Sequence, residues 1–245
     1  LGQNFLIDEA ALNGICELAC PGGKNVLEIG PGIGALTDKL AESAKLVLAV
    51  EIDRSMVELL SKTLAAHTNV HIVHSDFLRM KNSAILDAFG GEEFIVAANL
   101  PYYITSDASM KLIDSDLPIT GMVLMMQKEA AEHFLAAPRT KCYTPVSVIS
   151  QRYYTVSRCM KLPPASYFPD PAVDSVVLRF ERNESAYDRS FSKVVKAAFS
   201  MRRKTLRNNL SQLVPKEKAE NALFLAGIDP SARAETLDFS EFALL

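Results

Sequence analysis

The sequence predicts an α/β fold in which a mostly parallel sheet of seven strands is covered by helices and followed by a small all-helical domain. Two observations support this prediction. Short, nearly continuous apolar stretches alternate with amphipathic ones over the first two-thirds of the 245 residues, which is typical of parallel strands buried on both faces. From Tyr187 onward the apolar residues follow a helical period. We therefore place a domain boundary near Arg182, between residues 1–182 and residues 183–245.

The strands are expected in a regular order along the first domain. The first one ends at a glycine-rich turn, and the helices after the first two strands have apolar faces that include Leu36, Leu40, Leu60 and Leu64. The last two strands flank a proline-rich loop and are expected to form a hairpin at the sheet edge. The seven predicted strands are residues 26–29, 46–52, 70–73, 94–98, 122–126, 156–162 and 176–180.

The second domain is expected to be helical throughout. Its main signal is one apolar stripe with spacings i, i+3, i+4, i+7 and i+8, and residues 219–226 predict a further helix. The stripe consists of Phe191, Val194, Val195, Ala198 and Phe199.

The composition excludes several classes of protein. Apolar residues make up 49% of the chain and charged residues 22%, as in ordinary globular proteins. No apolar run reaches the roughly 18–20 residues of a membrane span, and no basic-then-apolar leader opens the chain, so we expect a soluble, cytoplasmic protein. Because the chain begins at Leu1 rather than Met, we expect the native N-terminus to lie upstream. Four cysteines without metal-site spacing favour reduced thiols and no bound metal.

A glycine-rich turn, residues 28–34 (EIGPGIG), follows the first strand and opens a helix. Glycines let the backbone turn tightly and let a ligand approach closely. The Gly-x-Gly-x-Gly spacing differs from the spacing that places a diphosphate at a helix N-terminus, and Pro31 removes an amide N–H that a phosphate would use. The acidic Glu28 before the glycines favours a cofactor with a positive amino group over a diphosphate.

Carboxylates end the next two strands. Glu51 lies 17 residues after Gly34, where a carboxylate can accept hydrogen bonds from both hydroxyls of a ribose. Asp76 ends the third strand in a position to accept from an adenine amino group, and Phe77 beside it offers an apolar face. A solvated strand end or a helix cap explains either carboxylate alone. Together, at one edge of a sheet, they predict a site for a nucleoside cofactor.

An Asn-Leu-Pro-Tyr tetrapeptide directly follows the fourth strand and predicts chemistry on an exocyclic amine. Such an amine is a poor nucleophile, and two acceptors for its N–H bonds help to aim its lone pair at an electrophilic methyl group. The Asn99 side-chain oxygen and a backbone carbonyl, for example that of Leu100, are the candidate acceptors. Pro101 stiffens the turn and Tyr102 offers a ring on which an extruded adenine stacks, with Phe168 as a second aromatic wall. An ordinary Asn/Pro turn beside a core tyrosine is the alternative.

Taken in order, these motifs resemble the KsgA-type family of ribosomal RNA adenine dimethyltransferases over essentially the whole chain. The resemblance implies a Rossmann-like class I methyltransferase fold and an S-adenosylmethionine-dependent enzyme that releases S-adenosylhomocysteine. It also implies N6-dimethylation of two adjacent adenosines in a hairpin near the 3′ end of small-subunit (16S) ribosomal RNA. The motifs are residues 1–6 (LGQNFL), 28–34, Glu51, Asp76, Asn99–Tyr102 (NLPY), 127–129 (QKE) and 168–175 (FPDPAVDS).

The resemblance further assigns site residues and a partner, while a monomer is the default expectation for the assembly state. The adenine amine is assigned to Asn99, Leu100, Pro101 and Tyr102, with Phe168 opposite. The partner is the small-subunit RNA or the 30S precursor particle, and the enzyme is expected to act as a monomer without a metal. The cofactor is assigned to Gln3, Asn4, Leu6, Gly30, Gly32, Glu51, Ile52, Asp76, Phe77 and Asn99.

The second domain also carries a candidate RNA-binding segment. The net charge is −3, yet residues 1–180 carry 15 Lys and Arg against 20 Asp and Glu, whereas residues 181–245 carry 11 against 9. A solvated helix face is the usual explanation for a charge run. In an otherwise acidic protein, on a helix with an apolar docking stripe, RNA phosphate binding is the better prediction. The basic segment consists of Arg202, Arg203, Lys204 and Arg207, with Lys193 and Lys196 as candidates for its extension.

Four other functions compete with this interpretation. An Erm-type enzyme, which methylates one adenine of 23S ribosomal RNA, shares most of the chemistry, but Leu100 in place of isoleucine and the FPDPAVDS segment favour the small-subunit enzyme. A non-catalytic RNA-binding assembly factor is disfavoured by the intact Asn99 and Tyr102. An NAD dehydrogenase is disfavoured because no acid–base histidine lies near a strand end. A DNA adenine methyltransferase more commonly has a second proline or an acidic residue in the tetrapeptide.

Overall fold

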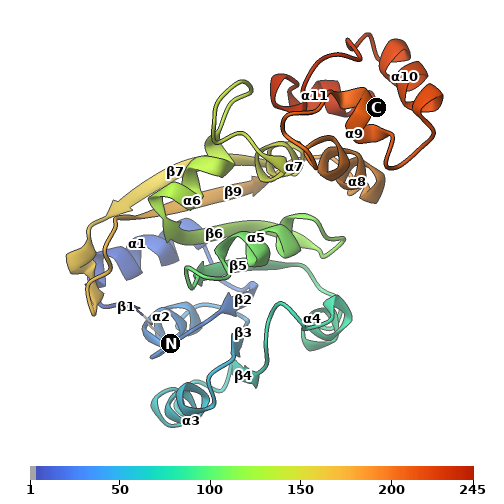
Figure 1. The fold of residues 1–245 in the computed structure, drawn as a ribbon. Coiled ribbons are helices and arrows are strands. Elements are labelled where there is room, and N and C mark those ends of the chain that lie inside the picture. Colours follow the sequence, from blue (N-terminus) through green and yellow to red (C-terminus); the bar gives the residue numbers. More distant parts are fainter. Residues whose placement is uncertain (1–3) are drawn as a thin grey trace. The chain divides into compact units, whose positions relative to one another are not determined.

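A computed structural model of the chain, drawn in Figure 1, describes residues 4–245. The chain folds into two compact units, and each unit is continuous in space although not in sequence. The first comprises Leu1–Leu112, Leu117–Ala131 and Val156–Arg182, and the second comprises Ile113–Asp116, Glu132–Thr155 and Asn183–Leu245.

Two segments that the sequence assigns to the first domain belong instead to the second unit: 113–116 and 132–155. Aromatic packing explains the longer one. The ring centroid of Tyr143 lies 6.0 Å from that of Phe199, and the centroid of Tyr153 lies 6.1 Å from that of Phe191, both edge to face. Burial of this aromatic surface, together with edge-to-face contacts, holds the segment in the second unit.

The first unit is built around a seven-stranded sheet with the order β4-β3-β2-β5-β6-β9-β7, which confirms the predicted Rossmann-like architecture. The first five strands in this order pair in parallel, and β9 pairs antiparallel with β6. Every residue of β2 is buried, which explains its almost entirely apolar sequence. The strands are β2 (Asn25–Ile29), β3 (Leu46–Glu51), β4 (Val70–His74), β5 (Phe94–Asn99), β6 (Ile119–Gln127), β7 (Tyr154–Leu162) and β9 (Ser175–Arg182).

A separate two-stranded sheet pairs the N-terminal segment with the loop between β7 and β9. In it β1 (Phe5–Leu6) runs antiparallel to β8 (Tyr167–Phe168), with Phe5 opposite Phe168. The backbone of Ile7 extends the connection by donating to the Ser166 carbonyl at 3.0 Å. The helices that lie in or begin in the first unit are α1 (Glu9–Ala19), α2 (Ala35–Ala41), α3 (Arg54–Thr63), α4 (Asn82–Ala88), α5 (Thr105–Ile113) and α6 (Lys128–Leu135), with the short η1 (Pro164–Ser166).

The C-terminal part is helical, as the sequence predicts. The expected stripe buries Phe191, Val195 and Ala198 on one face of α8, and the helix expected at 219–226 lies mostly within α10. Among the described residues, no helix combines the length and apolar character that a bilayer span requires. The helices of the second unit are α7 (Pro145–Tyr153), α8 (Arg189–Ala198), α9 (Leu206–Leu210), α10 (Lys216–Leu225), η2 (Ala234–Thr236) and α11 (Phe239–Phe242).

Candidate active site

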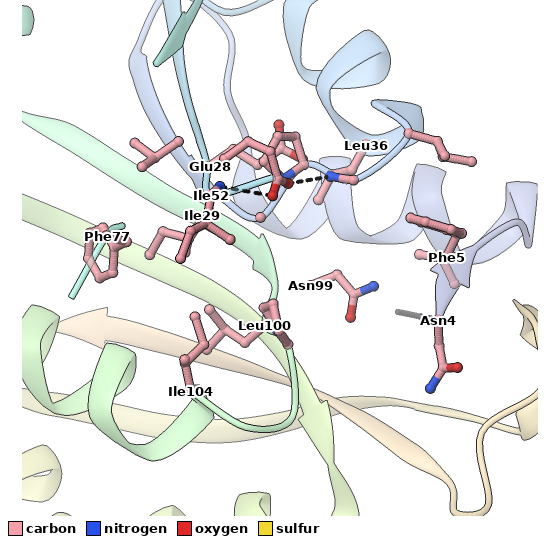
Figure 2. A pocket seen from close by; sticks show the side chains of 18 of the residues that line it. Asn4, Phe5, Glu28, Ile29, Leu36, Ile52, Phe77, Asn99, Leu100 and Ile104 are labelled. Atoms are coloured by element: carbon pink, nitrogen blue, oxygen red, sulfur yellow. Dashed lines mark hydrogen bonds between the residues drawn. The ribbon is translucent and has the colours of Figure 1, made fainter. Parts of the chain in front are cut away.

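A cavity of about 630 Å³ opens in the first unit where the parallel strands β2 to β5 end. Carboxyl ends of parallel strands meet at one edge of a sheet, and such an edge is a common ligand site in α/β folds. The wall is mainly apolar, with a few polar side chains among them (Figure 2). The lining residues assigned from the sequence are Asn4, Leu6, Gly30, Gly32, Glu51, Ile52, Asp76, Phe77, Asn99, Leu100, Pro101 and Tyr102.

The glycine turn leaves room for two neighbouring segments. Gly30 and Gly32 both have positive φ, +67° and +57°, a conformation that side-chain-bearing residues rarely adopt. A Cβ atom at Gly32 would lie 3.0 Å from the Phe5 ring, and one at Gly30 would lie 3.3 Å from the Pro101 ring. Glycine at these positions therefore allows the N-terminal strand and the tetrapeptide to approach the turn.

Glu51 is buried at the end of β3 and fixed by backbone amides. Its Oε1 accepts hydrogen bonds from the amides of Ile52 and Asp53, each at 2.9 Å, and its Oε2 accepts from the amide of Gly32 at 3.2 Å. Dashed lines in Figure 2 mark the bonds from Ile52 and Gly32. Two carboxylate oxygens offer about four acceptor positions, so capacity remains for a further donor such as a ribose hydroxyl. The side chain is thus held rigidly in the cavity wall before any ligand binds.

Asp76 and Phe77 form the wall next to the end of β4. Asp76 Oδ1 accepts from the amide of Leu78 at 2.9 Å, and its Oδ2 lies 3.4 Å from Nε of the exposed Arg79. The Phe77 side chain is only 4% exposed, yet it lines the cavity together with Ile104 (Figure 2). Asp76 and Phe77 thus give the cavity a carboxylate beside an apolar face. This combination is suited to an adenine ring with its amino group.

Glu28 provides a test of whether the site fits a cationic cofactor. It lines the cavity and is 2% exposed, and within residues 4–245 neither its Oε2 atom nor the buried Thr37 hydroxyl has a hydrogen-bond partner. Burial raises the pKa of Glu28 to about 8; the nearby Thr37 hydroxyl acts against this rise, and the charge of Glu51 adds to it. A positively charged group brought close would stabilise the ionised carboxylate. The ammonium and sulfonium groups of S-adenosylmethionine meet this need, so the residues present fit that cofactor.

The tetrapeptide is anchored at its backbone and directs Asn99 into the cavity. The amide of Leu100 donates to the Met125 carbonyl on β6 at 3.0 Å, and the Thr105 hydroxyl donates to the Pro101 carbonyl at 3.1 Å. Asn99 is the last residue of β5, and its amide group extends into the centre of the site in Figure 2. The Tyr102 hydroxyl lies 3.4 Å from the Ser175 hydroxyl at the start of β9.

Two assigned residues are not placed in this wall. Phe168 is absent from the described residues that line the cavity, and its side chain is 68% exposed on β8. Gln3 lies outside the described residues. The sequence reasoning also left out Phe5, whose ring borders Gly32, although its position within the LGQNFL motif was a usable signal. Tyr103, 60% exposed, lines the cavity beside the tetrapeptide.

The basic segment of the second unit divides into paired and exposed cations. The Arg202 guanidinium donates to the Lys141 carbonyl at 3.3 Å and lies 3.7 Å from Glu235 Oε2. Arg207 lies 3.4 Å from Glu220 Oε1. Arg203 and Lys204 are exposed and form none of the ion pairs found within residues 4–245. Of the two candidate extensions, Lys196 pairs with Asp114 at 2.5 Å and Lys193 is exposed.

The loop before α7 adds cations that the sequence reasoning missed. Arg139 and Lys141 are both exposed. The Arg139 amide donates to the Glu235 carbonyl at 2.7 Å, and the Lys141 carbonyl accepts from Arg202. These contacts bring the loop to the basic segment, from which it is about 60 residues distant in the chain. No local sequence pattern connects the two segments.

Comparison with known proteins assigns the family. The family model described as ribosomal RNA adenine dimethylase matches residues 1–245. The chain is 44% identical over 262 residues to ribosomal RNA small subunit methyltransferase A of Geobacillus thermodenitrificans, covering all of this chain and 88% of the relative. The protein of the same name from Anoxybacillus flavithermus is also 44% identical, over 258 residues with the same coverage.

Solved structures agree with the fold. A dimethyladenosine transferase from Plasmodium falciparum superposes with a TM-score of 0.81 at 26% identity, covering 98% of this chain and 95% of that one. The 23S rRNA methyltransferase ErmE superposes with a TM-score of 0.70 at 26% identity, covering 98% and 97%. Sequence and structure together show that the chain belongs to the ribosomal RNA adenine dimethylase family.

Proposed function

We propose that the chain dimethylates N6 of two adjacent adenosines near the 3′ end of small-subunit (16S) ribosomal RNA, with S-adenosylmethionine as the methyl donor. The observation that carries the proposal is the convergence of Glu51, Asp76 and Asn99 on one cavity at the strand ends. The 44% identity to relatives named small subunit methyltransferase A supports the choice of the small-subunit RNA.

The residues of the cavity bind the cofactor and orient its methyl group. Glu51 binds the ribose, Asp76 and Phe77 bind the adenine of the cofactor, and the bound cofactor supplies an electrophilic methyl group. Glu28 balances positive charge beside the glycine turn. Because most of these groups lie on a rigid sheet edge, the methyl donor is held in one place at little entropic cost.

The target amine is oriented by the tetrapeptide. The Asn99 side-chain oxygen and the Leu100 carbonyl accept its two N–H bonds, while Tyr102 stacks against the extruded base. After one methyl transfer the amine retains one N–H bond, so one acceptor can still hold it for a second transfer. The exposed Phe168 supplies the opposite wall once the base has entered. These roles are supported by the cavity-lining positions of Asn99, Leu100 and Tyr102.

The RNA partner is held by the second unit. Arg203, Lys204, Arg139 and Lys141 are exposed cations on neighbouring segments and are suited to phosphate contacts. Recognition by shape and phosphate contacts fits a folded RNA, because the deep groove of A-form RNA is poorly accessible to side chains. We propose that the physiological substrate is the 30S precursor particle in the cytoplasm and that the enzyme acts as a monomer.

A methylation assay with two substrates tests the proposal. The purified chain is incubated with methyl-labelled S-adenosylmethionine and either unmethylated 30S particles or 23S ribosomal RNA, and the nucleosides are identified by mass spectrometry. We expect N6,N6-dimethyladenosine in the 30S sample alone. Label confined to 23S RNA would support an Erm-type activity instead and overturn the assignment.

Asn99→Ala tests the acceptor role in the same assay. Loss of one preorganised acceptor is expected to slow methyl transfer by roughly 100- to 1,000-fold while RNA binding is retained. Asn13→Ala, at an exposed position of α1, is the control and should keep full activity. An Asn99→Ala enzyme with wild-type turnover is incompatible with this role, whereas loss of RNA binding as well would point to a folding defect.

A further inference from the structure

Lys111 lies on α5 outside the cavity, and its ammonium group is directed at one backbone turn. It donates to the carbonyl oxygens of Phe77 at 2.6 Å and Leu78 at 3.3 Å, and to that of Met80. An ammonium group has three N–H donors, so these three carbonyls match its full capacity. The side chain is half-buried, and burial lowers the pKa of Lys111.

The turn that Lys111 contacts carries the wall of the proposed adenine site. At its start, Asp76 Oδ1 accepts from the amide of Leu78, and the Asp76 carbonyl accepts from the amide of Met80 at 3.0 Å. The Phe77 carbonyl accepts from the amide of Met80 at 3.2 Å, and Lys111 adds a cationic donor to this carbonyl and to those of Leu78 and Met80. Cations are favourable in the same way at the carbonyls of a helix C-terminus. Asp76 therefore accepts from amides of the turn, and Lys111 donates to three of its carbonyls.

The same ammonium group lies against the ring of Phe77. The distance from Nζ to the ring centroid is 4.8 Å, within the range of a cation–π contact. Phe77 thus has Lys111 against its ring and lines the cavity, as Ile104 does. Ile104 directly precedes α5, and Lys111 lies near the end of this helix, about two helical turns later. The segment therefore supports both the wall and the turn behind it.

We propose that Lys111 is a positioning residue for the adenosine half of the cofactor, acting through the Asp76–Met80 turn. The inference rests on the proposed function in one respect, the assignment of Asp76 and Phe77 to the cofactor's adenine. Lys111 holds the carboxylate and the ring at their places in the cavity wall, so that the adenine meets a preformed site. Without the ammonium group, the Leu78 and Met80 carbonyls lose this donor, the Phe77 carbonyl keeps only the Met80 amide, and the turn can shift away from the cavity.

Cofactor binding by Lys111→Met and Lys111→Arg tests the proposal without requiring methyl transfer. Methionine keeps an unbranched side chain of similar length but has no donor, whereas arginine keeps the charge and several N–H donors. Calorimetry would measure the Kd for S-adenosylhomocysteine and for 5′-methylthioadenosine, which lacks the amino-acid portion. Lys62→Met, at an exposed position of α3, is the matched control.

We expect Lys111→Met to raise both Kd values by the same factor, about tenfold or more, which corresponds to roughly 1.4 kcal/mol. Lys111→Arg should recover part of the affinity, and Lys62→Met should bind as the wild type does. In turnover, the KM for S-adenosylmethionine should rise while kcat and the KM for RNA remain unchanged.

Two outcomes would overturn the proposal. One is wild-type affinity of Lys111→Met for both ligands. The other is a parallel loss of cofactor affinity, RNA affinity and thermal stability, since that pattern indicates a purely structural lysine. A failed methylation assay with the wild-type chain would instead contradict the proposed function, and the calorimetric result would remain interpretable.

Discussion

Glu51 Oε2 accepts a hydrogen bond from the backbone amide of Gly32 at 3.2 Å, which ties the end of β3 to the glycine turn after β2. The two residues are 19 positions apart in the chain, Glu51 at the end of β3 and Gly32 in the turn that follows β2, the neighbouring parallel strand. The carboxylate proposed to bind the ribose and the turn proposed to approach the methionine part of the cofactor are therefore fixed to each other before binding.

Replacement of Glu51 by glutamine is expected to weaken cofactor binding while the fold is retained. The amide nitrogen of glutamine cannot accept a hydrogen bond, so at least one of the three backbone amides loses its partner. The Kd for S-adenosylhomocysteine should rise about 10- to 100-fold, or roughly 1.4–3 kcal/mol. Calorimetry measures it, with Glu58→Gln, exposed on α3, as the control. Equal affinities for the two variants would contradict the role of Glu51.

The buried carboxyl of Glu28 predicts a pH-dependent stability. Its pKa in the folded chain is about 8, above the ordinary value of 4.5, so between these pH values the folded state holds a proton that the unfolded state releases. The free energy of unfolding without cofactor should therefore fall as pH rises from 5 to 8, by up to about 1.4 kcal/mol per pH unit from this group alone.

Urea unfolding of the wild type and of Glu28→Gln at several pH values isolates the contribution of Glu28. The difference in the free energy of unfolding between the two proteins should change steadily from pH 5 to pH 8, because glutamine does not titrate. Saturating S-adenosylhomocysteine should make the decline shallower, since its ammonium group favours the ionised carboxylate. Parallel pH profiles for the two proteins would show that Glu28 ionises normally.

Gly34→Ala is expected to destabilise the first unit through both its backbone and its side chain. Gly34 has φ +87°, and a Cβ there would lie 2.7 Å from Leu60 Cδ2, an atom of a fully buried side chain. Gly91 has a similar φ of +78° but open space around its Cβ position, so Gly91→Ala isolates the backbone cost. We expect about 1 kcal/mol for Gly91→Ala and roughly 2–4 kcal/mol for Gly34→Ala in urea unfolding. Equal losses of stability in the two variants would mean that the Leu60 side chain moves aside at no energetic cost.

The exposed pair Arg203 and Lys204 is expected to contribute to RNA affinity through phosphate contacts. The double variant Arg203→Ala/Lys204→Ala should weaken 30S binding and reduce the slope of log K against log salt by about one per lost contact. Filter binding over a range of salt concentrations measures both quantities. Lys62→Ala removes a similarly exposed cation of α3 and should leave the slope unchanged. An unchanged slope in the double variant would exclude these side chains as phosphate ligands.

The sequence predicts most of the sheet and much of the cavity because both follow from local patterns. Buried parallel strands give continuous apolar runs, and their carboxyl ends share one edge, so Glu51, Asp76 and Asn99 could be grouped before their coordinates were known. The predicted family, fold and type of enzyme are confirmed by the comparisons. The individual roles of these three residues stay predictions.

The sequence does not predict contacts between segments that lie far apart in the chain. Lys111 contacts a turn 31 to 34 residues earlier in the chain, and nothing in the local pattern of α5 distinguishes it from a solvated lysine. Phe168 begins the FPDPAVDS motif, but the pairing of β8 with β1 decides where its side chain lies. The assignment of 132–155 to the second unit depends in the same way on aromatic packing around Tyr143.

The strand pair β1–β8 has a mechanical consequence for the N-terminal segment. Phe5 pairs with Phe168, the Ile7 amide donates to the Ser166 carbonyl, and the Ser166 hydroxyl donates to Asp8 Oδ2 at 2.9 Å. This ladder ties the segment from Phe5 to Asp8 to the loop before β9. Phe5, which lines the cavity, and Phe168, the proposed wall for the target base, are therefore expected to move together.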